Sequence, residues 1–249
     1  DDIYEPDCLQ KLVAALDADP EIGIAGSTIT FMQEDGELIR VQPMPQTDLE
    51  VRWTILFHCP FFHPGSAFRK VLFDKVGGYH VNELISHDHY LWHDMLPHCR
   101  AMNLAEPLLR YRKNSQGLTA TNSGNKPRAR THAIREQRWR DIGLSYDLYD
   151  HQPAGDITSC LRGDLIAEPA RRYAAYAVIL RVMKAFLKSC RREFGGDHDR
   201  VARDLACRML VRMFWRAPVA WLRRPALLGL AWSLSPRATV RAFLKPNGR

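Results

Sequence analysis

The sequence predicts an α/β domain followed by a basic, mainly α-helical region. In the first half, apolar segments alternate between helical spacing and short runs rich in β-branched residues, which is typical of α/β folds. In the second half, apolar residues recur mainly at helical spacing. The charge divides the chain similarly, since residues 1–125 contain 10 Lys and Arg against 17 Asp and Glu, whereas residues 126–249 contain 25 against 11. We therefore expect two parts, 1–125 and 126–249.

The first elements are a helix and a strand. Residues 5–23 predict a helix that starts near Pro6 and is ended by Pro20 and Gly23. The expected buried face of this helix has four residues at helical spacing: Leu9, Leu12, Val13 and Leu16. The segment 22–31 (IGIAGSTITF) predicts a buried strand because it is short and rich in Ile and Thr.

Less regular sequence follows. Residues 33–37 predict a turn, and residues 40–60, which contain three prolines, predict an irregular surface segment. Residues 65–79 predict the end of a strand, a short helix and a Gly-Gly stop. A further helix is expected from Asp88 to about Met95, and residues 101–112 predict one or two strands.

The second part predicts two basic amphipathic helices, at 168–192 and 198–216. Their apolar stripes contain Tyr176, Ile179, Met183 and Phe186 in the first and Val201, Leu205, Met209 and Met213 in the second. Their basic stripes contain Arg181, Lys184, Lys188 and Arg191, and Arg200, Arg203, Arg212 and Arg216. Two interpretations stay open: a helical appendage with a solvated basic face, or helices that lie on an anionic membrane surface near Trp215, Trp221 and Trp232.

The composition fits a folded protein of a reducing compartment. Hydrophobic residues make up 46% and charged residues 25% of 249 residues, and the six cysteines are scattered without a C-x-x-C pair. The longest apolar stretch, residues 225–234, is too short to cross a bilayer. We expect a cytoplasmic protein with a possible peripheral position on the inner face of the membrane.

The chain begins with Asp1 and Asp2, directly before a predicted helix. Adjacent carboxylates can hold a divalent cation through oxygen ligands, with phosphates completing the shell. Acidic residues also favour helix starts because of the helix dipole, so these two residues carry little weight by themselves.

Five ordered segments resemble the inverting GT-A glycosyltransferases of family 2. They are DDIYEPDCL at 1–9, DPEIGIAGS at 19–27, FRKVLFDKVGGY at 68–79, HDHYLW at 87–92 and NLAEPLLRYR at 103–112. The resemblance covers about residues 1–119. It implies an incomplete GT-A (Rossmann-like) mixed sheet, because the nucleotide-binding half of the family should precede residue 1. We therefore expect this chain to be the C-terminal portion of such an enzyme.

The resemblance implies roles for three carboxylates. Asp88 matches the general base, which takes the proton of the acceptor hydroxyl. Asp1 matches the last Asp of the Asp-x-Asp metal motif and is supported by Asp2, which implies Mg²⁺ or Mn²⁺ at the nucleotide diphosphate. The sequence departs from the family at His87, where a Glu is usual, and at Tyr90, where an acidic residue is usual.

Further candidates follow from the same resemblance. Those for the donor diphosphate are Arg112 and Lys113, and those for the acceptor are His63, Ser66, His87 and Trp92. The alternatives are an ordinary surface pair for the two basic residues, strand-end packing for His63 and Ser66, and a core position for Trp92. A different reading of HDHYLWHD makes His89 and His93, four residues apart, zinc ligands, although the segment lacks the H-E-x-x-H order.

The sequence therefore predicts a metal-dependent glycosyltransferase that uses a nucleotide-diphosphate sugar and a saccharide or lipid-linked acceptor, in surface polysaccharide or glycoconjugate synthesis. The alternative is a non-catalytic module that binds nucleic acid or acidic partners through its basic helices. No recognised nucleic-acid motif accompanies the basic residues, so nucleic acid is the less favoured partner.

Overall fold

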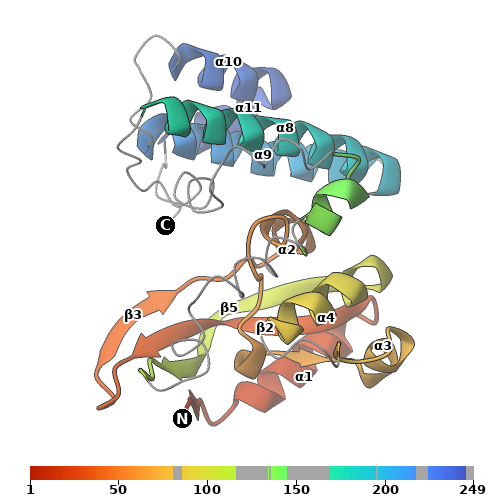
Figure 1. Ribbon diagram of the computed structural model, residues 1–249, viewed down its shortest axis with the longest axis vertical. Coiled ribbons are helices and arrows are strands. Elements are labelled where there is room, and N and C mark those ends of the chain that lie inside the picture. Colours follow the sequence, from red (N-terminus) through yellow and green to blue (C-terminus); the bar gives the residue numbers. More distant parts are fainter. Residues whose placement is uncertain are drawn as a thin grey trace. The chain divides into compact units, whose positions relative to one another are not determined.

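The protein is described from a computed structural model in which two compact units are seen, Asp1–Arg138 and Trp139–Arg249 (Figure 1). The described residues are 1–80, 86–115, 134, 136–144, 169–194, 196–216 and 224–244. The boundary expected at 125/126 lies outside these residues and stays a prediction.

The first unit is built on a five-stranded mixed sheet. Its strands are β1 (Ile3–Tyr4), β2 (Ile22–Met32), β3 (Leu38–Gln42), β4 (Ala67–Phe68) and β5 (Arg100–Arg112). The order is β1-β5-β2-β3, and β4 also pairs with β2. The central strands β2 and β5 are parallel, and all other pairs are antiparallel. The predicted α/β class is confirmed, and so are the strands predicted at 22–31 and 101–112.

Helix α1 (Cys8–Ala18) packs on one face of the sheet. Its buried residues are Cys8, Leu12 and Leu16, which contact a cluster that includes Ala25 of β2 and Leu108 of β5. The prediction that Leu9 and Val13 are buried is wrong, because they are 70% and 42% exposed. Residues Cys8, Leu12 and Leu16 form one i, i+4, i+8 row that faces the sheet. Leu9 and Val13 each follow a member of this row by one residue, so they lie on the neighbouring face of the helix.

Helices α2 (Asp48–Thr54) and α4 (His87–Met95) contribute to a second cluster, which includes Ile24 of β2. Ile24 and Ala25 are neighbours in the strand and belong to different clusters, as expected when successive side chains point to opposite faces. The largest member of this second cluster is Trp92, which is fully buried.

The prediction of an irregular surface segment at 40–60 is wrong. The segment contains the end of β3 and all of α2, and it buries Leu49, Val51, Trp53 and three residues that follow α2, Ile55, Leu56 and Phe57. A capping box starts the helix, since the Thr47 hydroxyl accepts from the Glu50 amide and the Glu50 carboxylate accepts from the Thr47 amide.

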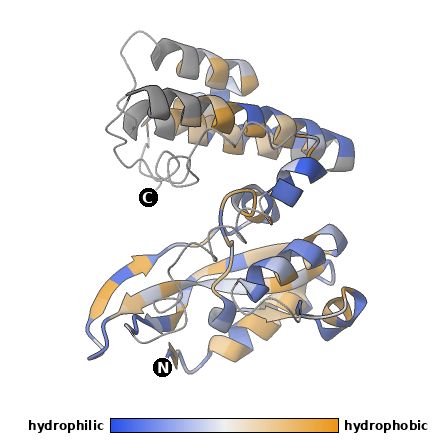
Figure 2. Cartoon of the chain, viewed as in Figure 1, coloured by the Kyte–Doolittle hydropathy of each residue, from blue (hydrophilic) through white to orange (hydrophobic). Residues whose placement is uncertain are grey.

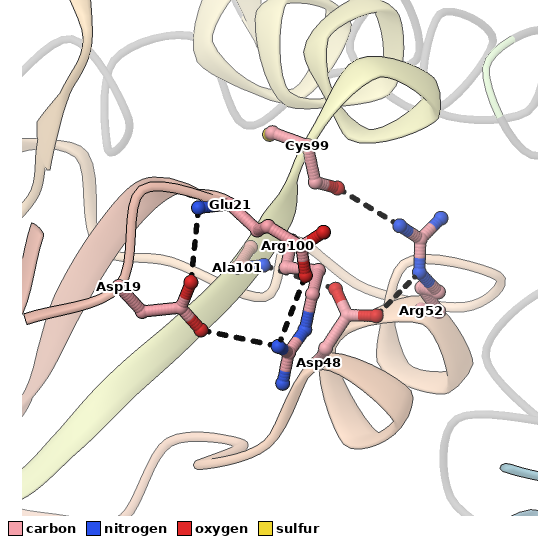
Figure 3. A network of polar contacts seen from close by, with 7 residues as sticks. All are labelled: Asp19, Glu21, Asp48, Arg52, Cys99, Arg100 and Ala101. Carbon is pink, nitrogen blue, oxygen red and sulfur yellow. Dashed lines mark hydrogen bonds and ion pairs between the residues drawn. The ribbon is translucent and has the colours of Figure 1, made fainter.

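Polar contacts attach α2 to the start of β5 (Figure 3). Asp48 accepts from the amide of Ala101 at 2.9 Å and pairs with Arg52 at 2.8 Å. Arg52 in turn donates to the carbonyl of Cys99 at 2.9 Å. Next to them, Arg100 pairs with Asp19 and Glu21 at the start of β2. The first contacts fix the helix to the beginning of β5, and those of Arg100 link β5 to the residues that precede β2.

The strand end and short helix predicted within 65–79 are confirmed as strand β4 and helix α3 (Lys70–Lys75). One turn of 3-10 helix, η1 (His63–Gly65), precedes them. Gly77 and Gly78 then adopt φ values of 82° and 78°. These left-handed conformations favour glycine and end the helix. They also turn the chain so that Tyr79 points back toward η1, which it contacts through His63.

The second unit contains the helices α8 (Pro169–Phe194), α9 (Gly196–Arg216), α10 (Arg224–Leu234) and α11 (Pro236–Leu244). Helix α9 packs against the other three. In α8 the predicted stripes are confirmed where described: Ile179, Met183 and Phe186 are buried, whereas Arg181, Lys184, Lys188 and Arg191 are exposed. In α9, Leu205 is buried but Val201 is 43% exposed, because the buried face runs through Ala202, Leu205 and Ala206.

Figure 2 shows hydrophilic and hydrophobic residues along both α8 and α9. The side chains of Tyr176, Arg212, Met213, Trp215, Arg216 and Trp221 lie outside the described residues. Within the described part of the chain, every helix is too short or too polar to cross a membrane.

Candidate active site

Asp88 lies in the first turn of α4. The residue before the helix, Ser86, has φ 64° and ψ 18° and is the only non-glycine residue with positive φ in the described chain. Such a conformation costs about 1–2 kcal/mol and is found preferentially at functional sites. The first turn is also the position where helix amides favour a negative charge. Backbone geometry therefore places a half-buried carboxylate at the start of this helix.

Aromatic and imidazole rings lie near this position, since the charge of Asp88 acts on both His63 and Tyr79. Within the group formed by His63, Tyr79, His87 and Trp92, the ring centroids of His63 lie 5.8 Å from Tyr79, 5.5 Å from His87 and 6.0 Å from Trp92. His87 also lies 5.4 Å from Tyr79. Three of these residues, His63, His87 and Trp92, are among the predicted acceptor residues, so the structure brings them together around Asp88. Their roles stay predictions.

The charge of Asp88 acts on its neighbours. Burial lowers the pKa of His63, with Asp88 opposing this shift and His87 adding to it. Burial raises the pKa of Tyr79, and Asp88 raises it further. At neutral pH the imidazole of His63 and the phenol of Tyr79 are therefore both uncharged. Their Nε2 and hydroxyl oxygen share a hydrogen bond of 2.7 Å. A carboxylate next to neutral donors and acceptors of this kind is suited to hold a hydroxyl compound.

Sequence reasoning missed two members of this group. Tyr79 belongs to the Gly-Gly-Tyr motif, which predicted a helix stop and supported the family resemblance but indicated no site role for the tyrosine. Cys59 lies in the segment that was predicted to be irregular, and its thiol donates to Asp88 Oδ2 at 3.8 Å. Burial raises the pKa of the Cys59 thiol well above its usual value, and the charge of Asp88 adds to the shift. Cys59 is thus a protonated donor to the carboxylate, and no pattern in the sequence indicated this contact.

The other predicted acceptor residues have structural contacts. The hydroxyl of Ser66 donates to the carbonyl of His63 at 2.7 Å, which closes the turn of η1. Trp92 is fully buried and packs edge-on against Phe61 and Phe68. Trp92 is therefore a core residue with one ring neighbour, His63, in the candidate site, and its role toward an acceptor stays a prediction.

The predicted metal and diphosphate residues form a second group at the end of β5. Pairing of Ile3 with Arg110 brings the N-terminal residues beside Arg112. The amide of Arg112 donates to Asp2 Oδ1 at 2.9 Å, and Asn114 Nδ2 donates to Asp1 Oδ2 at 2.8 Å.

The guanidinium of Arg112 is already engaged in this group. It donates to the carbonyls of Asp1, Gln33 and Glu34. Lys113 is exposed, and its ammonium lies 5.8 Å from the ring centroid of Phe31. Arg112 therefore fastens the two aspartates to the turn after β2, whereas Lys113 keeps its charge at the surface. A role of either residue in diphosphate binding stays a prediction.

An aromatic cluster connects the two groups. Phe31 of β2, Phe62 and Tyr111 of β5 contact one another at centroid distances of 5.3–5.7 Å. Phe62 directly precedes His63, and Tyr111 directly precedes Arg112. The cluster therefore brings together the chain segments that lead into the two groups.

The donor chemistry of Asp1 and Asp2 fits Mg²⁺ or Mn²⁺. Magnesium is commonly held by one or two carboxylates, with water and substrate phosphates completing its octahedron. Among the described residues, no three His, Cys, Asp or Glu side chains lie so that they could hold a metal ion, and this includes His89 and His93. A cation at the two aspartates would thus need oxygen ligands from a bound diphosphate.

Comparison with known proteins adds one relative. No protein-family model matches the chain. Over 150 residues the chain is 28% identical to a protein of Haemophilus influenzae described as an uncharacterized glycosyltransferase. The match covers 59% of this chain and 52% of that protein, so the chain spans about half the length of the curated relative it matches. The chain is thus similar to a glycosyltransferase, at a level that leaves the type of glycosyltransferase open.

Proposed function

We propose that this chain belongs to an inverting glycosyltransferase of the GT-A type, family 2, which transfers a sugar from a nucleotide-diphosphate sugar to an acceptor hydroxyl. The observation that carries the proposal is the carboxylate of Asp88, placed by a strained helix start beside His63, Tyr79 and His87. The similarity to a glycosyltransferase supports it. The acceptor is a saccharide or a lipid-linked saccharide, in surface polysaccharide or glycoconjugate synthesis at the cytoplasmic face of the membrane.

In this mechanism Asp88 accepts the proton of the acceptor hydroxyl while its oxygen attacks C1 of the donor sugar. The bond from C1 to the diphosphate breaks on the opposite side, so the configuration at C1 inverts. The neutral His63 and Tyr79 hold neighbouring hydroxyls of the acceptor by hydrogen bonds. Asp1 and Asp2 would hold a Mg²⁺ or Mn²⁺ ion, which neutralises the charge of the diphosphate.

The test compares Asp88→Asn with Asp94→Asn in the complete gene product that carries this sequence. Asp94 is the matched control, because it is a half-buried carboxylate on the same helix whose partner, at 2.7 Å, is His80. Release of nucleoside diphosphate from a pool of nucleotide sugars is followed with Mn²⁺. Loss of a general base lowers kcat by about 10²–10⁴-fold, and we expect this in Asp88→Asn alone.

Equal activity of the wild type and Asp88→Asn, with near-ultraviolet circular dichroism unchanged, would refute the role of Asp88. Equal losses in both variants would show that the effect is structural. The configuration of the new glycosidic bond, read by NMR, tests inversion separately. A product that retains the donor configuration would exclude the single displacement proposed here.

A further inference from the structure

The second unit contains a pocket of about 340 Å³ that is lined largely by arginine. It lies where the end of α10 meets the start of α11 over the N-terminal half of α9. Its lining consists of Arg200, Arg203, Asp204, Leu234, Ser235, Pro236 and Arg237. These residues come from three helices, so the pocket is formed only when the helices of this unit pack together.

The positive charge of the pocket is only partly compensated. Asp199 is buried and pairs with Arg203 at 2.7 Å and with Arg191 at 3.3 Å. Neither Arg200 nor Arg237 has an ion-pair partner in the part of the chain that the structure describes. Two arginines of the lining are therefore not engaged in an ion pair within the described residues, and guanidinium is the side chain best suited to phosphate oxygens.

A second feature of the pocket, the residue Asp204, narrows the chemical class of ligand that it could take. Asp204 belongs to the lining of the pocket, and its Oδ1 is buried without a hydrogen-bond partner among the described residues. A buried acceptor left unpaired is unfavourable. A ligand that combines a phosphate for Arg200 and Arg237 with a hydroxyl for Asp204 satisfies both requirements. This is the chemistry of a phosphate ester of a polyol.

The surface next to the pocket indicates where such an ester comes from. Arg237, Val240, Arg241 and Leu244 follow helical spacing on α11, and all four are exposed. Leu244 is 75% exposed, and Trp232 on α10 is 55% exposed. Arginine next to exposed aliphatic and Trp side chains is the composition of helices that lie in the interface of anionic membranes.

We propose that the arginine pocket and the outer face of α11 dock the second unit on an anionic membrane surface, with the phosphodiester of a hydroxylated lipid headgroup in the pocket. Arg200 and Arg237 bind the phosphate, and Asp204 accepts from a headgroup hydroxyl. The outer apolar residues of α11 enter the headgroup layer. This docking is independent of the proposed sugar transfer.

Flotation of the whole protein with vesicles tests the proposal. Vesicles of phosphatidylcholine with phosphatidylglycerol are compared with vesicles of phosphatidylcholine alone. The double variant Arg200→Gln/Arg237→Gln is expected to lower partitioning onto the anionic vesicles about 30-fold, at roughly 1 kcal/mol for each arginine near the surface. The control is Arg181→Gln/Lys188→Gln, which removes the same charge from exposed positions of α8. At physiological salt the control should stay within about twofold of the wild type, because charges beyond the Debye length of about 8 Å are screened.

Three results would overturn the proposal. The first is absence of binding to anionic vesicles. If soluble glycerol 3-phosphate then raises the Tm of the protein, the pocket binds a free phosphate ester instead of a lipid. The second is an equal loss in the control, which would mean that overall charge and not this surface drives binding. The third is binding to duplex DNA without binding to vesicles.

Discussion

Replacing Asp48 by alanine tests how the first unit holds α2 against the sheet. The side chain of Asp48 is only 9% exposed, and it both pairs with Arg52 and accepts from the amide of Ala101 (Figure 3). Removal of one partner from a buried ion pair costs about 3–5 kcal/mol, and a buried amide without an acceptor costs about 1–3 kcal/mol. The two costs overlap, and Arg52 keeps its bond to the carbonyl of Cys99. We therefore expect a loss of about 3 kcal/mol in the free energy of unfolding of the first unit.

The matched control is Asp74→Ala on α3. Asp74 also forms an i, i+4 pair, with Lys70 at 2.6 Å, but the two side chains are 55% and 83% exposed. Such a pair contributes at most about 0.5 kcal/mol. The assay is a urea titration in which hydrogen exchange of peptides from β5 detects unfolding. These peptides report the unfolding midpoint of the first unit separately from that of the second. Equal urea midpoints for Asp48→Ala and Asp74→Ala would refute the argument that burial of an ion pair, and not the distance between its charges, sets its contribution to the free energy of unfolding.

Three further predictions use the same unit. Because burial lowers the pKa of His63, its imidazole stays neutral in the folded protein as the pH falls below about 6.5, whereas His63 of the unfolded chain takes up a proton. The free energy of unfolding therefore decreases as the pH falls through this range. In urea titrations at several pH values, His63→Gln should remove this decrease. Asp1→Asn should weaken binding of Mn²⁺ with a nucleoside diphosphate by at least about tenfold, measured by calorimetry; unchanged affinity would exclude Asp1 as a ligand. Gly23→Ala places a Cβ 2.6 Å from that of Cys99 and should cost about 1–3 kcal/mol in unfolding experiments, whereas Gly229→Ala, with open space around it, should be neutral or stabilising.

Several elements were predictable because their signals lie within a few consecutive residues. The run IGIAGSTITF predicted β2, and it forms the buried centre of the sheet. Gly77 and Gly78 predicted the stop after α3, since only glycine adopts their φ values readily. The predicted helix start at Asp88 agrees with α4 within one residue. Helix α2 was missed because nearby prolines suggested a loop, although Thr47 and Glu50 at capping-box spacing were a visible signal.

The sequence by itself determined the two central strands, the two long helices of the second half, the opposite charges of the two halves, and the position of Asp88 at a helix start. Only the tertiary structure decided that α1 turns Leu9 to solvent and that Tyr79 and Cys59 lie beside Asp88. It also decided that Arg112 binds backbone carbonyls. The physical reason is the distance along the chain over which each kind of interaction acts. Periodicity and caps depend on residues within about one or two turns of each other, whereas the buried face of a helix and the partners of a side chain depend on packing between segments far apart in the chain.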